Sequence, residues 1–215
     1  MSVSLIWLRR DLRLADNPAL AQAKADGRPL LFLFHVDSER LDRHDVDGIH
    51  VQWELDCLDR LRQDIEHKGG IVLFRFGQIL DSLNELHEHY NIQTIYGNEE
   101  SGLQWSWNRD KSVATWCNEN DVQFEEFPSN GVIRRLRSRD DWKALRDRRI
   151  DSSLVEAPQR IRAPDNVESD LIPHASELGF EVRELQQRPE PGESAAMDTL
   201  FSFLDERGRG YRKGM

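Results

Sequence analysis

Acidic and basic side chains crowd together at three points of the sequence, each at the end of a short apolar run. Arg9, Arg10 and Asp11 follow the first run, 35–37 end the second, and 98–100 follow the fourth. Residues of these types hydrogen-bond the edge of a planar heteroaromatic ring, such as a pterin or flavin, which carries both donors and acceptors. The three segments therefore predict a cleft for such a ring, although a loop of solvated ion pairs fits the spacing equally well.

Short β-rich runs alternate with amphipathic stretches along the first 130 residues. The runs are predicted as strands Val3–Leu8, Leu30–Val36, Ile71–Phe76, Ile92–Tyr96 and Val122–Phe127, with helices at about Pro18–Ala25, Ile49–Glu66, Ile79–His89 and Gly102–Glu119. This alternation predicts an α/β fold, with five strands in a mostly parallel, Rossmann-like, doubly wound sheet. The ligand cleft of such a sheet lies at the carboxyl ends of its strands, where the charged segments fall.

The first two helices carry specific signals. Asn17 fits an N-cap, Pro18 the first helical position and Gly27 the residue after the last turn. In the second helix, apolar residues at helical spacing predict a stripe packed on the sheet: Trp53, Cys57, Leu58, Leu61 and Ile65. Core packing is also the role that we predict for the helical tryptophans Trp53, Trp105, Trp107 and Trp116.

Composition excludes several classes of protein. The longest uninterrupted apolar run, 30–34, has five residues, far short of a membrane span, and the N-terminus lacks the apolar core of a secretory signal. Cys57 and Cys117 lie among apolar neighbours, which predicts reduced thiols in a cytoplasmic protein. The G-x-G-x-x-G motif after the first strand, the P-loop motif and the G-x-S-x-G motif are absent. No metal site is predicted from His87 and His89, because residues i and i+2 of a helix diverge by about 200°.

Charge is unevenly spread. The net charge is -10, but between Val132 and Arg149 seven Arg and one Lys stand against three Asp, a local balance of +5. Such a run is more often a solvated face or an interface with a neighbouring domain than a DNA-binding site. We therefore expect this segment to bind duplex DNA only weakly and without sequence preference.

Regular patterning fades after Phe127. Six prolines lie between Pro128 and Pro191, where apolar runs are few, and this predicts a linker wrapped over a surface. One more helix is predicted beyond Ser194, with Met197, Leu200, Phe201 and Leu204 on a shared face. Nothing later in the sequence covers that face, which predicts that the chain is the N-terminal portion of a longer protein.

Several segments of the chain resemble the DNA photolyase and cryptochrome family. The clearest is WLRRDLRLADNPAL at 7–20, and weaker ones are GGIVLF at 69–74, YGNEE at 96–100 and RD at 109–110. Near the end, GESAA at 192–196 and LFSFL at 200–204 resemble the family's entry into its helical flavin domain. The resemblance implies an N-terminal antenna domain at 1–130, an interdomain linker at 131–193 and the start of the helical FAD-binding domain at 194–215.

In that family the α/β domain holds a light-harvesting antenna chromophore, either methenyltetrahydrofolate or a flavin or deazaflavin. The predicted cleft and the resemblance together suggest seven antenna contacts: Arg10, Asp11, Asp37, His44, Glu99, Glu100 and Arg109. His44 falls where folate-binding members place a histidine, but it also fits an exposed loop, and Arg109 also fits a helical ion pair with Asp110. Tyr211 resembles the first residue of the family's FAD-binding segment, and FAD itself is expected only in the longer protein.

The resemblance implies that the longer protein is a deoxyribodipyrimidine photolyase, a lyase that reverses cyclobutane pyrimidine dimers in UV-damaged DNA with light. In that reaction reduced FAD donates an electron to the lesion, and every residue for this step would lie in the C-terminal helical FAD domain, the expected partner. These 215 residues alone are therefore predicted not to be catalytic and to be a monomer without membrane association. The alternatives are a cryptochrome-type blue-light photoreceptor and a stand-alone nucleotide-binding α/β module, which the uncovered last helix disfavours.

Overall fold

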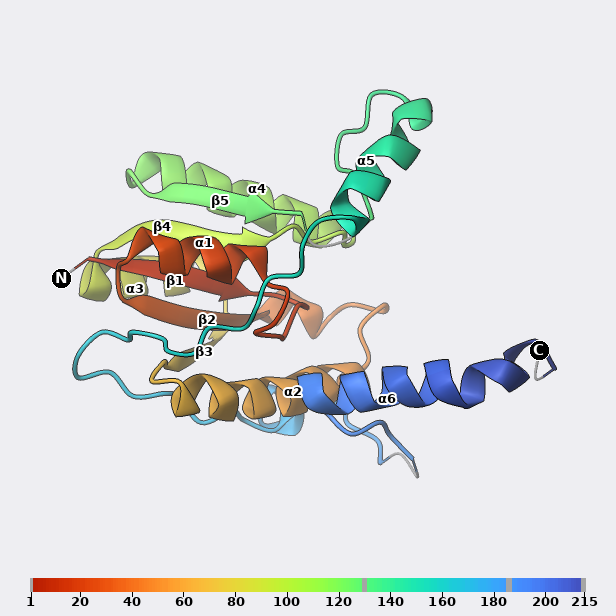
Figure 1. The fold of residues 1–215 in the computed structure, drawn as a ribbon. Coiled ribbons are helices and arrows are strands. Elements are labelled where there is room, and N and C mark those ends of the chain that lie inside the picture. Colours follow the sequence, from red (N-terminus) through yellow and green to blue (C-terminus); the bar gives the residue numbers. More distant parts are fainter. Residues whose placement is uncertain (1, 129–130, 185–186, 214–215) are drawn as a thin grey trace.

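The protein forms a five-stranded parallel sheet in a computed structural model, which describes residues 2–128, 131–184 and 187–213 (Figure 1). The strands are β1 (Val3–Leu8), β2 (Leu30–Asp37), β3 (Val72–Gly77), β4 (Ile92–Asn98) and β5 (Gln123–Phe127). Their order is β3-β2-β1-β4-β5, and every neighbouring pair is parallel. The predicted α/β, doubly wound, Rossmann-like fold is confirmed, and the strand bounds agree with the sequence prediction to within two residues.

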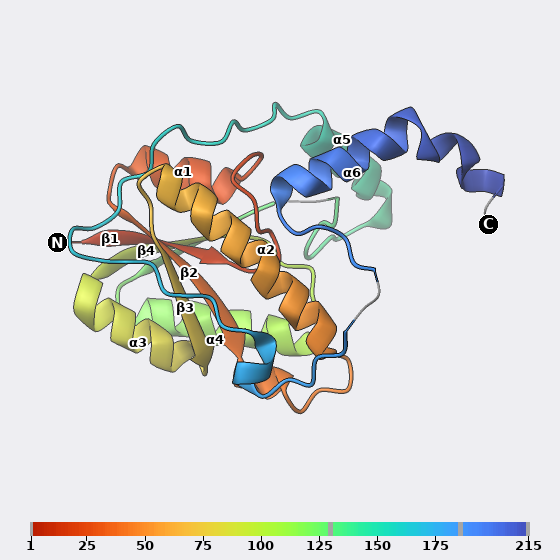
Figure 2. The ribbon, with the colours of Figure 1, turned by 90° about the horizontal axis from the view of Figure 1, so that it is seen from below.

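Helices cover both faces of the sheet (Figure 2). The helices α1 (Pro18–Asp26) and α2 (Gly48–His67) lie on one face, and α3 (Ile79–Tyr90) and α4 (Gln104–Glu119) lie on the other. Alternate residues of β1 enter the two cores, because side chains of a strand point to opposite faces. Ile6 and Leu8 join the core with α1 and α2, whereas Leu5 and Trp7 join the core with α3 and α4.

The predicted signals of the first two helices have mixed outcomes. Asn17 accepts from the Leu20 amide as N-cap of α1, and Gly27 ends that helix with a φ of 79°, as predicted. Cys57 and Cys117 are buried free thiols, also as predicted. The prediction that Trp53 packs in the core is wrong, since the residue is 38% exposed. Its turn of α2 lies opposite the loop after β1, so no strand stands there to bury it.

The chain after β5 first leaves the sheet and then returns to it. It forms a helix that the sequence did not predict, α5 (Trp142–Ile150), and then runs along the edge of the sheet. There the Ile161 amide donates to the Lys68 carbonyl at 2.8 Å and the Asp170 amide to the Val72 carbonyl at 2.9 Å. Ile161, Ala175 and Phe180 are buried in the core beside α1 and α2. The domain boundary predicted at 130 falls on 129–130, which lie outside the described residues.

The last helix, α6 (Glu193–Asp205), buries none of its residues and points away from the sheet (Figure 1). Its predicted apolar face is exposed: Met197 45%, Leu200 46%, Phe201 53% and Leu204 62%. No helix of the described residues is long and apolar enough to cross a membrane.

Candidate functional site

Buried and partly buried charges meet at the carboxyl edge of the sheet in a group that we call the edge cluster: Arg9, Asp37, Glu100, Arg109, Asp110, Glu126 and Arg134. At its centre is the Arg109 side chain of α4, which is 8% exposed. The Arg109 guanidinium contacts Asp37 Oδ2 at 3.1 Å, Glu100 Oε2 at 2.7 Å and Asp110 Oδ1 at 3.0 Å. One side chain thus joins the end of β2 and the loop after β4 to α4.

A second buried guanidinium, that of Arg9, extends the edge cluster toward β5. Its Nη1 contacts Asp110 Oδ2 at 3.2 Å and Glu126 Oε1 at 2.9 Å. Both guanidinium groups make cation-π contacts with the Trp7 ring, with Arg9 at 4.3 Å and Arg109 at 4.8 Å from the ring centroid. A Cβ atom at Gly97 would stand 3.2 Å from Arg9 Nη2, so the glycine leaves room for this guanidinium.

Burial and ion pairing act against each other in the edge cluster. Burial raises the pKa of Asp37 and of Asp110, although the Arg109 charge opposes both shifts. Burial disfavours ionisation of Glu100 too, but Arg109 holds the pKa of that carboxyl below its ordinary value. Burial and the Arg109 charge lower the pKa of His35 to about 4, so this histidine is neutral at pH 7. The charged side chains therefore compensate one another within the protein.

Asn98, at the end of β4, ties the loop after β1 to the start of α1. Its amide nitrogen donates to Asp11 Oδ2 and, at 2.8 Å, to Asn17 Oδ1. Its Oδ1 accepts from the Ala19 amide at 3.3 Å. Asp11 Oδ1 also accepts from the Arg9 amide at 3.2 Å. Asp11 and Asn17, both in the family-like segment at the start of the chain, therefore hold the charged loop in a fixed shape.

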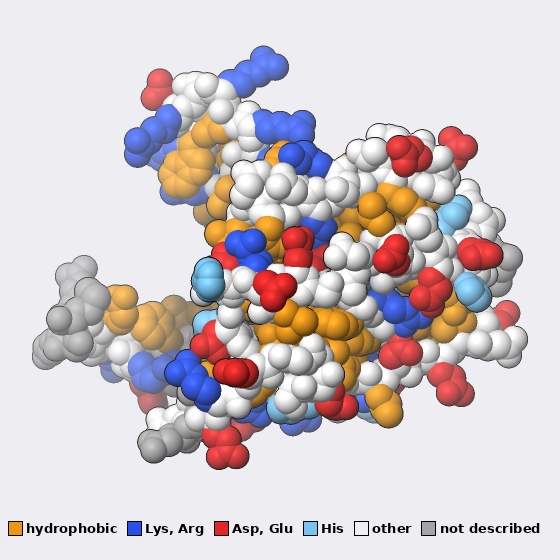
Figure 3. Space-filling view, turned by 180° about the vertical axis from the view of Figure 1, so that it is seen from behind, with side chains coloured by type: hydrophobic (Ala, Val, Ile, Leu, Met, Phe, Trp, Pro, Cys, Tyr) orange, Lys and Arg blue, Asp and Glu red, His pale blue; other side chains and the backbone are white. Residues whose placement is uncertain are grey.

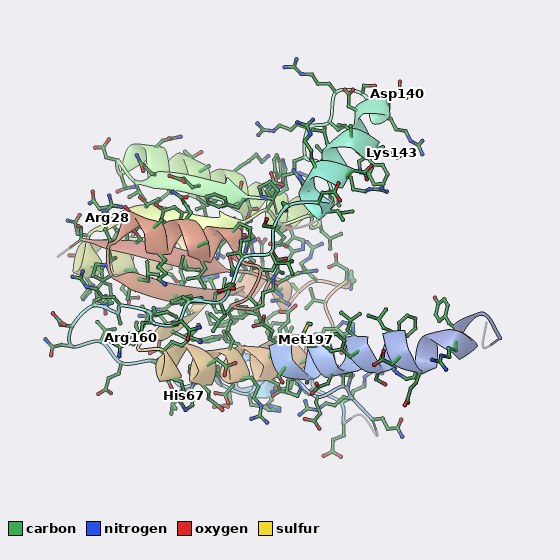
Figure 4. All side chains as sticks on the ribbon, viewed as in Figure 1. Arg28, His67, Asp140, Lys143, Arg160 and Met197 are labelled. Carbon is green, nitrogen blue, oxygen red and sulfur yellow. The ribbon has the colours of Figure 1, made fainter. Side chains whose placement is uncertain are left out.

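A cavity of about 710 Å³ lies between that loop, α2 and the start of α6. Its charged rim comes from Arg10, Asp11, Arg13, Asp16, Glu54 and Glu193. Its apolar walls come from Leu12, Ala15, Trp53, Cys57, Leu154, Ala196 and Met197, with His50 and Gly192 completing the lining. Figure 4 shows Met197 where the first turns of α2 and the start of α6 overlap. Glu193 closes one side, because its carboxylate accepts from the Leu14 and Ala15 amides at 2.9 and 3.1 Å.

The predicted site residues separate into three groups. Arg10 and Asp11 line the cavity. Asp37, Glu100 and Arg109 lie in the edge cluster, linked to the cavity by the 3.7 Å contact between Arg10 Nε and Glu100 Oε1.

The remaining three lie elsewhere. Glu99 faces the Arg149 guanidinium at 3.6 Å, and His44 is exposed in the loop before α2. Tyr211 is 56% exposed, and its ring stands edge-on to Phe203 at 5.8 Å. Among the described residues, no group of three or more His, Cys, Asp or Glu side chains could hold a metal ion.

Sequence reasoning missed the α2 and α6 side of the cavity. A helix that connects parallel strands runs antiparallel to them and begins near the carboxyl end of the strand before it, so the first turns of α2 lie at the carboxyl edge of the sheet. The aromatic residue in those turns, Trp53, is the signal that could have identified this wall. No local pattern pointed to Glu193, whose acceptor role depends on a loop 178 residues earlier in the chain.

Known proteins similar to this chain include both photolyases and cryptochromes. Deoxyribodipyrimidine photo-lyase of Synechococcus sp. is 32% identical over 96 residues, which are 45% of this chain and 20% of that protein. Cryptochrome-1 of Drosophila melanogaster is 31% identical over 134 residues, 59% of this chain and 24% of that protein. A class III photolyase from Agrobacterium tumefaciens has the same fold, with a TM-score of 0.77 at 21% identity over all of this chain and 47% of its own.

The chain thus spans less than half the length of these relatives. A family-wide sequence profile described as DNA photolyase matches residues 4–142, well over half of the chain. The chain therefore belongs to the photolyase and cryptochrome family and carries its N-terminal α/β domain.

Proposed function

We propose that this chain is the N-terminal portion of a DNA photolyase that repairs cyclobutane pyrimidine dimers, and that its cavity binds a light-harvesting antenna chromophore. The observation that carries the proposal is the cavity of about 710 Å³ at the carboxyl edge of the sheet. This volume lies within the range of sites for cofactors and other small molecules. Its polar rim and apolar walls suit a planar heteroaromatic ring such as methenyltetrahydrofolate, a flavin or a deazaflavin.

Trp53, Met197 and Leu154 would contact the face of that ring, and Arg10 and Asp11 would bond its polar edge. The chromophore supplies absorption of light at wavelengths that protein side chains do not absorb. The edge cluster would contribute indirectly, because its carboxylates are already paired with Arg109 and Arg9. Asp37, Glu100 and Arg109 are thus proposed to position Arg10 and the cavity rim, and Asp11 to contact the chromophore itself.

The test is a titration of methenyltetrahydrofolate, FMN and a deazaflavin into the chain, followed by absorbance and fluorescence. Trp53→Ala and Asp11→Asn should each weaken the chromophore that binds by roughly tenfold to a hundredfold, as expected for one aromatic or charge-assisted contact. Glu99→Gln is the matched control, because Glu99 faces Arg149 and does not line the cavity. It should leave the affinity within about twofold.

Two results would contradict the proposal. Binding that Trp53→Ala and Asp11→Asn leave unchanged would move the chromophore out of the cavity. Failure of all three chromophores to bind, both to this chain and to a longer protein that includes a helical FAD domain, would reject the antenna role. Repair itself requires that longer protein, tested by light-dependent reversal of thymine dimers with Tyr211→Ala as the probe of its FAD contact.

The second candidate is a cryptochrome-type photoreceptor, favoured by the 31% identity to Cryptochrome-1 of Drosophila melanogaster. It would keep the antenna fold and FAD but would report light instead of reversing dimers. A repair assay separates it from a photolyase. A stand-alone nucleotide-binding module is disfavoured by the exposed apolar face of α6.

A further inference from the structure

The turn after β5 and α5 project from the sheet as a basic arm, which we define as residues 131–154 (Figure 1). No residue of α5 is buried. In the space-filling view, Lys and Arg side chains gather on this projection (Figure 3). Four cations of the basic arm are exposed and make neither an ion pair nor a cation-π contact with any residue that the structure describes: Arg137, Arg139, Lys143 and Arg148. A fifth exposed cation, Arg135, lies 5.7 Å from the centroid of the Trp107 ring.

Large apolar side chains are exposed beside these cations. Trp142 is 40% exposed, Ile150 66% and Leu154 80%. The Trp142 ring is held in place, because its Nε1 donates to the Gly131 carbonyl at 3.0 Å and the Arg146 guanidinium lies 4.7 Å from its centroid. The basic arm therefore presents an oriented aromatic ring together with unpaired positive charge.

A groove of about 570 Å³ separates the basic arm from the loop after β1. Arg13, Arg148 and Arg149 line it against one carboxylate, that of Asp16. The Arg13 guanidinium donates to the Asp16 main-chain carbonyl at 3.1 and 2.8 Å, and no carboxylate among the described residues forms an ion pair with it. The apolar part of the groove comes from Pro18, Pro128, Leu145, Ile150 and Leu154. The groove thus offers cations and apolar surface side by side.

We propose that the basic arm and this groove bind a single strand of nucleic acid. Phosphates would pair with Arg13, Arg148 and the exposed cations of the arm, and unstacked bases would pack on Trp142 and the apolar part of the groove. Charge complementarity favours this occupant, since 132–149 carries +5 whereas the rest of the chain carries -15. A polyanion is therefore attracted to the basic arm and repelled elsewhere.

The single strand is preferred to a duplex because a duplex keeps its bases stacked and would leave Trp142 and the apolar surface without a partner. Negative charge at the outer end of the basic arm limits the path of the bound nucleic-acid strand. Asp140 lies at the outer end of the basic arm, and Lys143 lies nearer the body (Figure 4). The strand is thus expected to follow the side of α5 toward the groove. The groove shares Arg13, Asp16 and Leu154 with the antenna cavity. Trp142 and the four exposed cations of the basic arm do not line that cavity, so the variants below test this inference independently of the antenna proposal.

The test is fluorescence anisotropy of an oligo(dT) of about twelve nucleotides with the whole chain, at salt between about 50 and 200 mM. With four to five phosphates neutralised, the slope of log K against log salt should be about -3. An arm variant combines Arg137→Gln, Arg139→Gln, Lys143→Gln and Arg148→Gln. It should bind at least about tenfold more weakly at about 50 mM salt.

The matched control removes the same charge from exposed positions elsewhere: Lys24→Gln, Arg60→Gln, Lys111→Gln and Arg160→Gln. Arg160 lies far from α5, as Figure 4 shows. The control should stay within about twofold of the parent, whereas an equal loss in both variants would overturn the proposal. Circular dichroism checks that every variant is folded.

Base contact has its own test. Trp142→Ala should weaken oligo(dT) binding by about tenfold, and Trp142→Phe should retain most of the affinity. Inorganic polyphosphate binding as tightly as oligo(dT), with no effect of Trp142→Ala, would overturn the assignment to nucleic acid. So would tighter binding of poly-glutamate, which would identify an acidic protein segment as the occupant, or no binding of oligo(dT) at about 50 mM salt.

Discussion

The edge cluster and the basic arm are both rich in arginine, but they use it in opposite ways. Arg109 is 8% exposed and contacts three carboxylates, each within 3.1 Å. Arg137 and Arg148 are exposed and have no carboxylate partner among the described residues. A guanidinium taken out of water needs nearby carboxylates to offset its lost hydration, whereas one that stays hydrated does not. Burial, which the sequence does not display, thus separates a structural arginine from one that is available to a ligand.

The largest expected effect comes from breaking the edge cluster at its centre. Arg109→Met would leave Asp37, Glu100 and Asp110 buried without their shared cation, and should lower the free energy of unfolding by about 3 to 5 kcal/mol. Urea denaturation of the variant and the parent measures this difference. Arg148→Met is the matched change in the basic arm and should alter stability by less than about 0.5 kcal/mol. Similar losses in the two variants would remove the contrast between the regions.

The sequence predicted the features that depend on neighbouring residues better than the contacts between residues far apart in the chain. The strands followed from short apolar, β-rich runs, the first helices from patterning at helical spacing, and the caps of α1 from Asn17 and Gly27. The charged segments at the ends of β1, β2 and β4 were predicted to meet, and Arg109 does bring Asp37 and Glu100 together. That prediction required only the rule that parallel strands end at one edge.

What the sequence could not predict is which charges pair with one another. Glu126 and Arg134, both in the edge cluster, carry no local mark that separates them from Glu125 and Arg135. α5 was missed because five of its nine residues are charged and its few apolar residues form no continuous stripe. Trp53 was misplaced because helical spacing shows which residues share a face but not where the sheet ends.

A moderate effect is expected from the Asn98 contacts, which hold the loop between the edge cluster and the cavity. Asn98→Ala removes its bonds to Asp11, Asn17 and the Ala19 amide, all at buried or partly buried positions. Unfolding free energy should fall by about 1 to 3 kcal/mol, since partners are left unsatisfied. Thr94→Ala, at a buried position on the same strand, serves as a control for the loss of a polar side chain from β4. If Asn98→Ala lowers the unfolding free energy no more than Thr94→Ala does, the Asn98 hydrogen bonds contribute no specific stabilisation.

A smaller, pH-dependent effect is expected from His35, which touches the edge cluster at Asp37. Its pKa is lowered to about 4 in the folded chain from an ordinary 6.5, so the unfolded chain binds the proton more readily. The stability from neutral His35 is therefore complete above pH 6.5 and is lost as the pH falls toward 4. Between pH 7 and 5.5 the loss should be about 1 kcal/mol. His35→Gln should remove that part of the pH dependence, and an unchanged pH profile would contradict the assignment.

The smallest effect on stability is expected where the basic arm is neutralised. The four Gln substitutions at Arg137, Arg139, Lys143 and Arg148 break no ion pair among the described residues, and α5 buries no side chain. Thermal unfolding should therefore shift by less than the equivalent of about 0.5 kcal/mol, although four charges are removed. Reduced repulsion among these neighbouring cations should raise stability slightly, and more so at low salt. A loss of about 2 kcal/mol or more would mean that the arm cations hold the fold as Arg109 does, and the two regions would no longer differ in kind.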